Sequence, residues 1–215
     1  MVGRRLDDDE GDGMTTQHLH TQGLHTQGPH TQRPHTQRPH ARRLHAVLDT
    51  PIGPVAVAVA DGAVTHVRMT RSDDASPDPF GDAPGTRVVP DDDPVLAEAA
   101  RQLEAYFAGA LRTFDLPLRP TGSAFQLLVW EGLRRIPYGT TTTYGALAAD
   151  LGLDPRTSSR AVGAANGANR IAIVVPRHRV IGADGTLTGF AAGVDRKRSL
   201  LDLEEGDAGR AATLF

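Results

Sequence analysis

The chain has 215 residues, of which 39% are hydrophobic and 23% are charged, and its formal net charge at neutral pH is −3. This length suits one or two domains, and no apolar run approaches the roughly 18 residues that a membrane span needs. An acidic stretch, not an apolar one, follows Arg4 and Arg5, so no secretory signal is predicted. We therefore expect a cytoplasmic protein without a membrane partner.

The sequence contains no cysteine. Disulfides, cysteine-ligated zinc and thiolate nucleophiles are therefore excluded as features of this chain. A mechanism that needs a sulfur atom as acceptor is excluded with them.

Charge is distributed unevenly along the chain. Residues 1–44 carry +1, residues 45–118 carry −7, and residues 119–206 carry +3. A change of sign between adjacent segments favours contact of the second with a polyanion. Two solvated surfaces of different charge explain the same numbers equally well.

Residues 1–44 are predicted to be a disordered tail. Histidine recurs at positions 20, 25, 30, 35, 40 and 45, a period that fits neither a helix nor a strand. The tract lacks the apolar residues that could offset the entropy of ordering. We expect no metal site, and favour a repeat-expanded segment or a downstream start of translation at Met14.

Residues 45–118 are predicted to form a small α/β domain. Asp61-Gly62 is a strong hairpin turn between two apolar runs. Asp93-Pro94 is a good start for a helix, which Gly109 would end. The predicted strands are 44–48, 55–60, 63–69 and 114–118, and residues 70–93 are predicted to be a loop.

Residues 119–206 are predicted to be a second, mainly helical domain, with residues 207–215 as a tail. Ser123 caps its first helix, which ends before Pro137. Two short helices, 144–151 and 156–168, form a helix-turn-helix candidate. A buried strand is expected at 171–175 and a closing helix at 196–204.

The helix from 156 to 168 has an unusual composition, because nearly every residue from Ala161 to Gly167 is small. A helix without bulky side chains can approach another surface closely, either a packing partner or a narrow groove. Arg160, a long cation at its start, favours the groove, because such a residue could displace a base.

Several pieces of residues 125–204 carry a combined signature. They are Ile136-Pro137-Tyr138-Gly139, Thr143-Tyr144-Gly145-Ala146-Leu147-Ala148, Ser159-Arg160-Ala161-Val162-Gly163-Ala164-Ala165-Asn166, Ile173-Val174-Val175-Pro176, His178-Arg179-Val180-Ile181-Gly182, Leu187-Thr188-Gly189-Phe190 and Lys197-Arg198-Ser199-Leu200-Leu201-Asp202-Leu203-Glu204. In this order they resemble the DNA-binding and active-site domain of the O6-alkylguanine-DNA alkyltransferases. Leu48-Asp49-Thr50-Pro51-Ile52-Gly53 resembles a piece of that family's N-terminal domain. The resemblance implies an α/β (α+β) fold with a sheet-and-helix domain before a helix-turn-helix domain.

The resemblance also implies roles for individual residues. Arg160 falls on the finger that fills the space left by a flipped guanine, and Tyr144 on the tyrosine that pushes the 3′ phosphate. Asn169 falls on the asparagine that braces the helix, and His178 and Glu204 on the pair that deprotonates the acceptor thiol. The remaining implied DNA-binding residues are Ala161, Gly163, Asn166 and Arg179, and the implied lesion pocket is Tyr144, Val175, Pro176, Arg177 and Phe190.

The acceptor residue itself differs from the family motif. The motif Pro-Cys-His-Arg reads Pro176-Arg177-His178-Arg179 here. A guanidinium keeps its proton and has no lone pair for attack. We therefore expect a protein that is not an enzyme and needs no cofactor or metal, with family-type methyl transfer disfavoured. The resemblance is then to the alkyltransferase-like branch, which binds O6-alkylguanine in double-stranded DNA and flags it for nucleotide excision repair proteins. We expect a monomer.

Two arrangements of Arg177 follow from its chemistry. It could pair with Glu204 and fill the pocket, leaving a DNA-binding or regulatory module. Alternatively it could point into the pocket and donate to guanine O6 and N7. We favour lesion binding, because the residues implied in base flipping are present.

Overall fold

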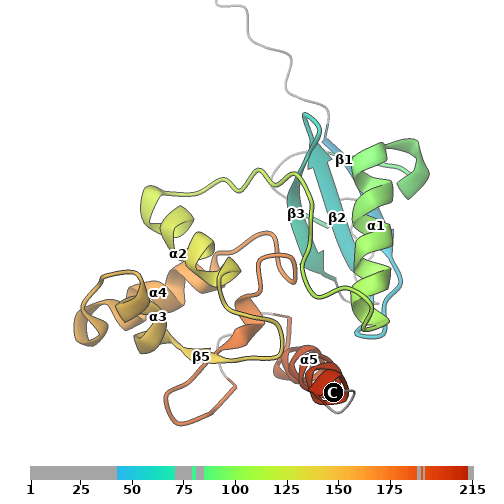
Figure 1. Cartoon of the computed structure of the whole chain (residues 1–215). Coiled ribbons are helices and arrows are strands. Elements are labelled where there is room, and N and C mark those ends of the chain that lie inside the picture. The colour runs from blue at the N-terminus through green and yellow to red at the C-terminus, as the bar shows by residue number, and fades with distance from the viewer. Residues whose placement is uncertain (1–42, 71–78, 81–84, 188–189, 191, 213–215) are drawn as a thin grey trace, which may run out of the picture. The chain divides into compact units, whose positions relative to one another are not determined.

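The computed structural model describes residues 43–70, 79–80, 85–187, 190 and 192–212 of the 215-residue chain. Residues 1–42 of the predicted tail, and residues 71–78 and 81–84 of the predicted loop, lie outside these ranges. Within them, a sheet with one long helix precedes a group of helices (Figure 1), as expected for the fold class. No described helix has the length and apolar character needed to cross a membrane.

The N-terminal part is built on a four-stranded sheet of order β3-β2-β1-β4. Alternating and β-branched residues form β1 (Arg43–Leu48), β2 (Val55–Ala60) and β3 (Ala63–Met69), which are antiparallel neighbours. The Asp61-Gly62 turn was predicted correctly, and both residues adopt positive φ. The short β4 (Gly85–Arg87) pairs in parallel with β1 and was not predicted.

Helix α1 (Pro94–Phe107) follows a single 3-10 turn, η1 (Pro90–Asp92), and covers one face of the sheet (Figure 1). The Asp93 carboxylate accepts hydrogen bonds from the first free backbone N–H groups, which explains the start of the helix. Leu96, Leu103 and Tyr106 on the inner side are buried against the sheet.

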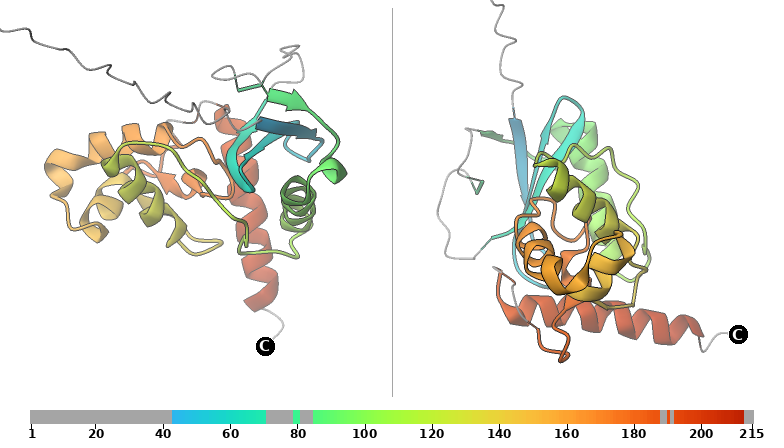
Figure 2. Two further views of the ribbon diagram at one scale, coloured as in Figure 1. Left: turned by 90° about the horizontal axis from the view of Figure 1, so that it is seen from above. Right: turned by 90° about the vertical axis from the view of Figure 1, so that its left-hand side faces the viewer.

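The C-terminal part contains α2 (Ala124–Arg134), α3 (Tyr144–Asp150), α4 (Pro155–Gly167) and α5 (Val194–Ala212) (Figure 2). A two-stranded parallel sheet joins β5 (Thr142–Thr143) to β6 (Val180–Ile181). Trp130 of α2 donates its indole N–H to the Ala165 carbonyl of α4 over 2.7 Å. This bond fixes the first helix against the helix-turn-helix pair.

Two predicted strands are not regular strands. Residues 171–175 are buried, but Ile173 has φ +70°, so the chain turns in the middle of the run. Residues 114–118 contribute only an isolated bridge, from Leu118 to Val64. Burial of an apolar run therefore did not imply an extended backbone here.

The turn at 173 is attached to the edge of the N-terminal sheet. The Val67 N–H of β3 donates to the Arg170 carbonyl over 2.8 Å, and the Ala172 N–H donates back to Val67 over 3.0 Å. The segment that carries the family-like Pro176-Arg177-His178-Arg179 motif therefore begins on the rigid edge of a sheet.

Candidate functional site

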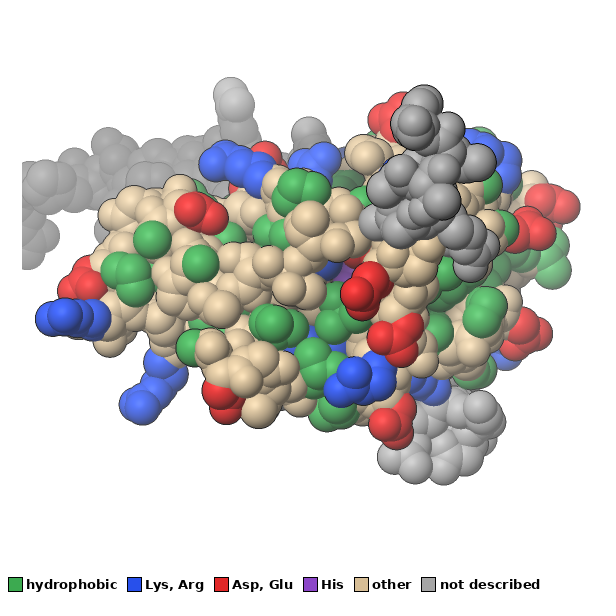
Figure 3. All heavy atoms as spheres, turned by 60° about the horizontal axis from the view of Figure 1, so that its bottom comes forward, with side chains coloured by type: hydrophobic (Ala, Val, Ile, Leu, Met, Phe, Trp, Pro, Cys, Tyr) green, Lys and Arg blue, Asp and Glu red, His purple; other side chains and the backbone are tan. Residues whose placement is uncertain are grey.

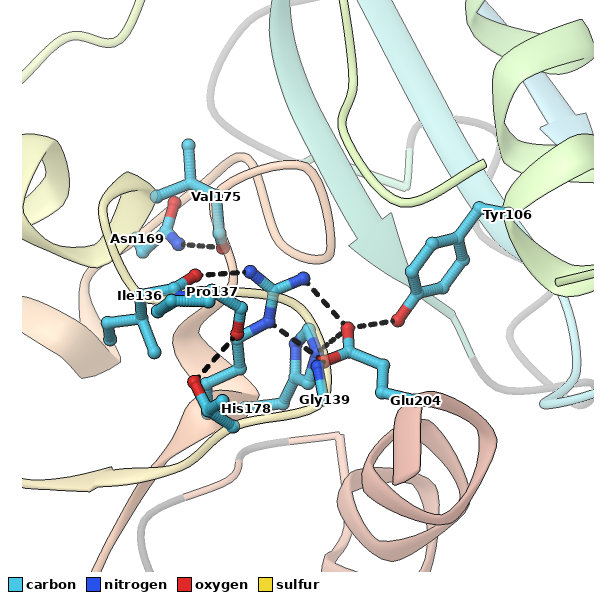
Figure 4. A network of polar contacts seen from close by, with 10 residues as sticks. Tyr106, Ile136, Pro137, Gly139, Asn169, Val175, His178 and Glu204 are labelled. Carbon is cyan, nitrogen blue, oxygen red and sulfur yellow. Dashed lines mark hydrogen bonds and ion pairs between the residues drawn. The ribbon is translucent and has the colours of Figure 1, made fainter. Parts of the chain in front are cut away.

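The motif lies in a tight turn whose backbone is held by a neighbouring asparagine. After Pro176 the chain forms the 3-10 turn η2 (Arg177–Arg179) and then enters β6. The Asn169 amide donates to the Val175 carbonyl over 2.9 Å, and its oxygen accepts from the Ile171 N–H over 2.9 Å. Asn169 thus ties the segment after α4 to the turn (Figure 4).

A buried carboxylate, Glu204 on α5, is the centre of the polar contacts in this region (Figure 4). Its Oε1 accepts from the Tyr106 hydroxyl at 2.8 Å, from His178 Nε2 at 2.9 Å and from Arg179 Nη2 at 2.9 Å. Its Oε2 accepts from Arg179 Nε at 2.9 Å and from the Gly139 N–H at 3.1 Å. Every lone pair of this carboxylate is therefore used.

These contacts determine the protonation states. Burial alone would raise the pKa of Glu204, but hydrogen bonds and charges from His178 and Arg179 outweigh it and lower the pKa to about 2. Burial lowers the pKa of His178 despite the opposing effect of Glu204. We therefore assign a neutral imidazole whose Nε2–H faces the ionised carboxylate and whose Nδ1 has no hydrogen-bond partner among the described residues.

Three residues of the predicted lesion pocket lie together. Arg177 is 8% exposed, and its guanidinium lies over the Phe190 ring, 4.5 Å from the ring centroid. Its Nη1 donates to the Gly167 carbonyl over 3.4 Å. Burial lowers the pKa of Arg177, and an electrostatic interaction with Tyr144 opposes this, which places that tyrosine on the same site.

The exposed side of α4 carries small side chains around one cation. Arg160, Ala161 and Ala164 are exposed, whereas Val162 and Ala165 face the core. A side chain at Gly163 would contact the Tyr144 ring at 3.6 Å. The helix therefore exposes Arg160 together with small side chains, on a helix that also approaches Tyr144 of the predicted pocket.

Two residues expected to contact DNA are instead held inside the protein. Arg179 is 6% exposed, because both of its guanidinium edges are occupied by Glu204 and by the Ile136 carbonyl, the latter at 2.6 Å. Asn166 is 2% exposed and donates to the Arg177 carbonyl over 3.3 Å. Both assignments to the DNA surface are corrected to structural roles.

Of the two arrangements considered for Arg177, the pairing with Glu204 is not observed. Glu204 binds Arg179, two residues further along the chain, and Arg177 makes no ion pair within the described residues. The pocket-filling arrangement that depended on this pair is therefore not the one observed.

Sequence reasoning missed three members of the site. Tyr106 on α1 and Gly139 after α2 both donate to Glu204, and Lys197 on α5 is 1% exposed with its Nζ donating to the Val180 carbonyl over 2.6 Å. Gly139 and Lys197 both belong to family-like motif pieces, which is the sequence signal for these two residues. Tyr106 lies 98 residues from Glu204 and gave no local signal.

Charge on the surface is mixed. On the face shown in Figure 3, basic and acidic side chains are interspersed. This face therefore carries no continuous basic patch of the kind that the net charge of the second segment suggested. The described residues also contain no group of three or more histidine and acidic side chains suited to a metal ion.

Comparison with known proteins gives matches over most of the chain. The DNA-binding domain of the 6-O-methylguanine DNA methyltransferase family matches residues 124–206, and the ribonuclease-like domain of that family matches residues 44–120. A methylated-DNA–protein-cysteine methyltransferase of Methanosarcina acetivorans is 46% identical over 159 residues, covering 74% of this chain and 96% of the relative. The protein of that name from Mycobacterium tuberculosis is 44% identical over 168 residues, covering 78% and 96%.

Solved structures give the same result. The crystal structure of the Mycobacterium tuberculosis O6-methylguanine methyltransferase superposes with a TM-score of 0.69 at 42% identity, covering 80% of this chain and 99% of that one. The OGT of the same organism in complex with DNA gives 0.67 at 42% identity, covering 76% and 94%.

These relatives correct one expectation. They are named as methyltransferases, which are enzymes, so the inference from position 177 that the chain is not an enzyme is contradicted. The difference in sequence remains, with Arg177 in place of the motif cysteine.

Proposed function

Because the chain belongs to the 6-O-methylguanine DNA methyltransferase family, we propose that it binds double-stranded DNA through α4 and recognises an O6-alkylguanine that is flipped out of the duplex. The flipped base would enter a pocket formed by Tyr144, Val175, Pro176, Arg177 and Phe190. Arg160 fills the space that the base leaves. The proposal concerns recognition, the step that precedes any transfer. Within the family, it places the chain among the members that lack the acceptor cysteine.

One observation carries the proposal. The exposed small-residue face of α4, with Arg160 on it, adjoins Tyr144, and the electrostatic interaction of Tyr144 with Arg177 connects that face to the pocket. A minor groove admits such a face, because small side chains let the helix backbone approach the sugar edges. The relative solved with DNA supports DNA as the partner.

The test compares matched duplexes that differ at one base, guanine or O6-methylguanine, by fluorescence anisotropy at fixed salt. We expect at least tenfold tighter binding of the O6-methylguanine duplex, about 1.4 kcal/mol. Equal affinities would instead favour a DNA-binding module whose pocket Arg177 closes, an alternative that the stacking of Arg177 on Phe190 supports.

Partners and assembly are a further part of the proposal. We propose a monomer that makes the bound lesion available to nucleotide excision repair proteins. Sedimentation of the free protein and of its complex with the O6-methylguanine duplex tests the first point. A one-to-one complex is expected, whereas two chains on a single lesion would contradict it.

A further inference from the structure

Arg177 is a buried cation that has no carboxylate partner in the described part of the chain. Its guanidinium is stacked on Phe190, its one described hydrogen bond is the 3.4 Å contact with the Gly167 carbonyl, and its buried Nε has no hydrogen-bond partner. Within the described residues, no acidic side chain contributes to its electrostatic environment. A buried charge in this condition is unfavourable unless an anion or several acceptors satisfy it.

The carboxylate in the same region cannot fill this role. Both oxygens of Glu204 are occupied, and its charge is paired with Arg179. A second buried cation, Lys197, lies close enough for Arg177 to influence it: burial and the charge of Arg177 together lower the pKa of Lys197 to about 8. Two buried cations thus lie in this region, and Glu204 is already committed to Arg179 rather than to Arg177.

The position of Arg177 indicates where an anion would enter. The relatives are named for methyl transfer to a cysteine, and a sulfur that receives an alkyl group must reach the carbon attached to guanine O6. Arg177 stands at the motif position of that cysteine. Phe190 covers a face of the guanidinium and not its plane, so the in-plane N–H groups other than the one bonded to Gly167 can donate, and a carboxylate can accept two N–H groups together.

We propose that the pocket around Arg177 selects guanines whose O6 substituent carries a negative charge, such as O6-carboxymethylguanine, over guanines with a neutral O6-alkyl group. The inference rests on the proposed function, because it requires the base to enter this pocket. It adds the chemical class of the lesion and assigns its selection to Arg177. The carboxylate of the lesion would supply the anion that this arginine lacks among the described residues.

The experiment measures the affinity of the full-length protein for three duplexes of one sequence. They contain guanine, O6-methylguanine or O6-carboxymethylguanine at the same position, at fixed salt and pH 7. We expect the carboxymethyl duplex to bind at least tenfold more tightly than the methyl duplex. Arg177→Gln, which keeps donors but removes the charge, should reduce this ratio to about one, and Arg177→Lys should keep part of it.

Two controls separate the site from general effects. Arg101→Gln removes an exposed arginine of α1, whose side chain is 65% exposed, and should leave the ratio unchanged. Thermal unfolding of Arg177→Gln should show no loss of stability, because the variant removes a buried charge that lacks a carboxylate partner. A folded Arg177→Gln protein that keeps the wild-type ratio would overturn the assignment to Arg177.

The three duplexes also separate this inference from the proposed function. Equal binding of the methyl and carboxymethyl duplexes, both tighter than guanine, overturns the inference and leaves lesion recognition in place. Equal binding of all three overturns both. A preference for the carboxymethyl duplex alone supports the inference and narrows the proposed function to anionic lesions.

Discussion

The Tyr106 hydroxyl donates a 2.8 Å hydrogen bond to Glu204, joining a helix of the N-terminal part to the last helix of the chain. Through Glu204 the same contact reaches His178 and Arg179, which lie directly after Arg177. The N-terminal domain is therefore part of the site, because its Tyr106 hydroxyl is one of the donors that hold the Glu204 carboxylate in place.

Removing that donor should destabilise the fold. Tyr106→Phe keeps the buried ring but removes a hydrogen bond to a charged group, and we expect a loss of about 1.5–3 kcal/mol in the free energy of unfolding. Urea denaturation measures it. Tyr144→Phe is the matched control, since the Tyr144 hydroxyl has no hydrogen-bond partner among the described residues, and its midpoint should stay near that of the wild type. Equal effects of the two changes would mean that the Tyr106 bond contributes nothing.

Acid should lower the stability of the fold by protonating Glu204. Its pKa is lowered from 4.5 to about 2 in the folded protein, so its contribution to stability is fully present above pH 4.5 and is lost as the pH falls towards 2. The pKa difference corresponds to a contribution on the order of 3 kcal/mol. Glu204→Gln should flatten the fall in stability over this window. It should also destabilise the protein at pH 7 by about 3–5 kcal/mol, because Arg179 loses its carboxylate.

The measurement is the urea midpoint of both proteins between pH 2 and pH 5. A Glu204→Gln variant with the same acid dependence as the wild type would show that other groups govern this transition. Restoring the charge with Glu204→Asp, whose carboxylate is one methylene shorter, should recover part of the pH dependence but little of the stability.

The local parts of the fold were predictable from sequence, and the reasons are local. A hairpin signal at Asp61-Gly62 and a capping signal at Asp93-Pro94 are complete within a few residues. By contrast, the positive φ of Ile173 depends on pairing of its neighbours with the edge of β3, more than 100 positions earlier in the chain. The pattern of residues within 171–175 does not indicate this contact with β3.

The motif pieces point to residues that lie around Glu204, but not to how these residues are arranged. The motif pieces identified the buried turn and Glu204, but they did not determine which arginine pairs with the carboxylate. Arg177 and Arg179 are both arginines of one motif, and their roles differ because Glu204 faces one of them. A polar residue on a helix, such as Asn166, likewise gave no sign that it is turned inward.

The asparagine brace should be sensitive to substitution. Asn169→Ala leaves the buried Ile171 N–H without its acceptor, and an unsatisfied buried group costs about 1–3 kcal/mol. It also removes one of the two donors to the Val175 carbonyl, which keeps the Arg177 N–H. Asn166→Ala is the comparison, because the Asn166 side chain makes one hydrogen bond within the described residues, and that bond is longer. We expect a clearly larger shift of the urea midpoint for Asn169→Ala, and the reverse order would contradict the brace.

Loss of Arg160 should reduce the affinity for lesion-containing DNA more than the affinity for undamaged DNA. Arg160→Ala removes a cation that has no described partner in the free protein, so its stability should be unchanged. If Arg160 fills the space of the flipped base, affinity for the O6-methylguanine duplex should fall about tenfold or more, and affinity for guanine should fall less. A phosphate-only role would instead weaken both duplexes alike and reduce the salt slope by about one. Anisotropy across a salt series distinguishes the two.

A cysteine introduced at position 177 should lie next to groups that can deprotonate its thiol. His178 is neutral, oriented by Glu204 through Nε2, and keeps the Nδ1 lone pair without a partner in the described structure. Such a base is what a cysteine needs to become a thiolate.

We therefore expect Arg177→Cys to take up the methyl group of O6-methylguanine DNA. One methyl per chain should be detected by intact-protein mass spectrometry and located at position 177 by peptide mapping. Arg177→Ser is the matched control, because its hydroxyl keeps its proton at neutral pH and should gain no methyl group. An unmodified Arg177→Cys protein that still binds the duplex would mean that His178 and Glu204 no longer act as a proton-accepting pair.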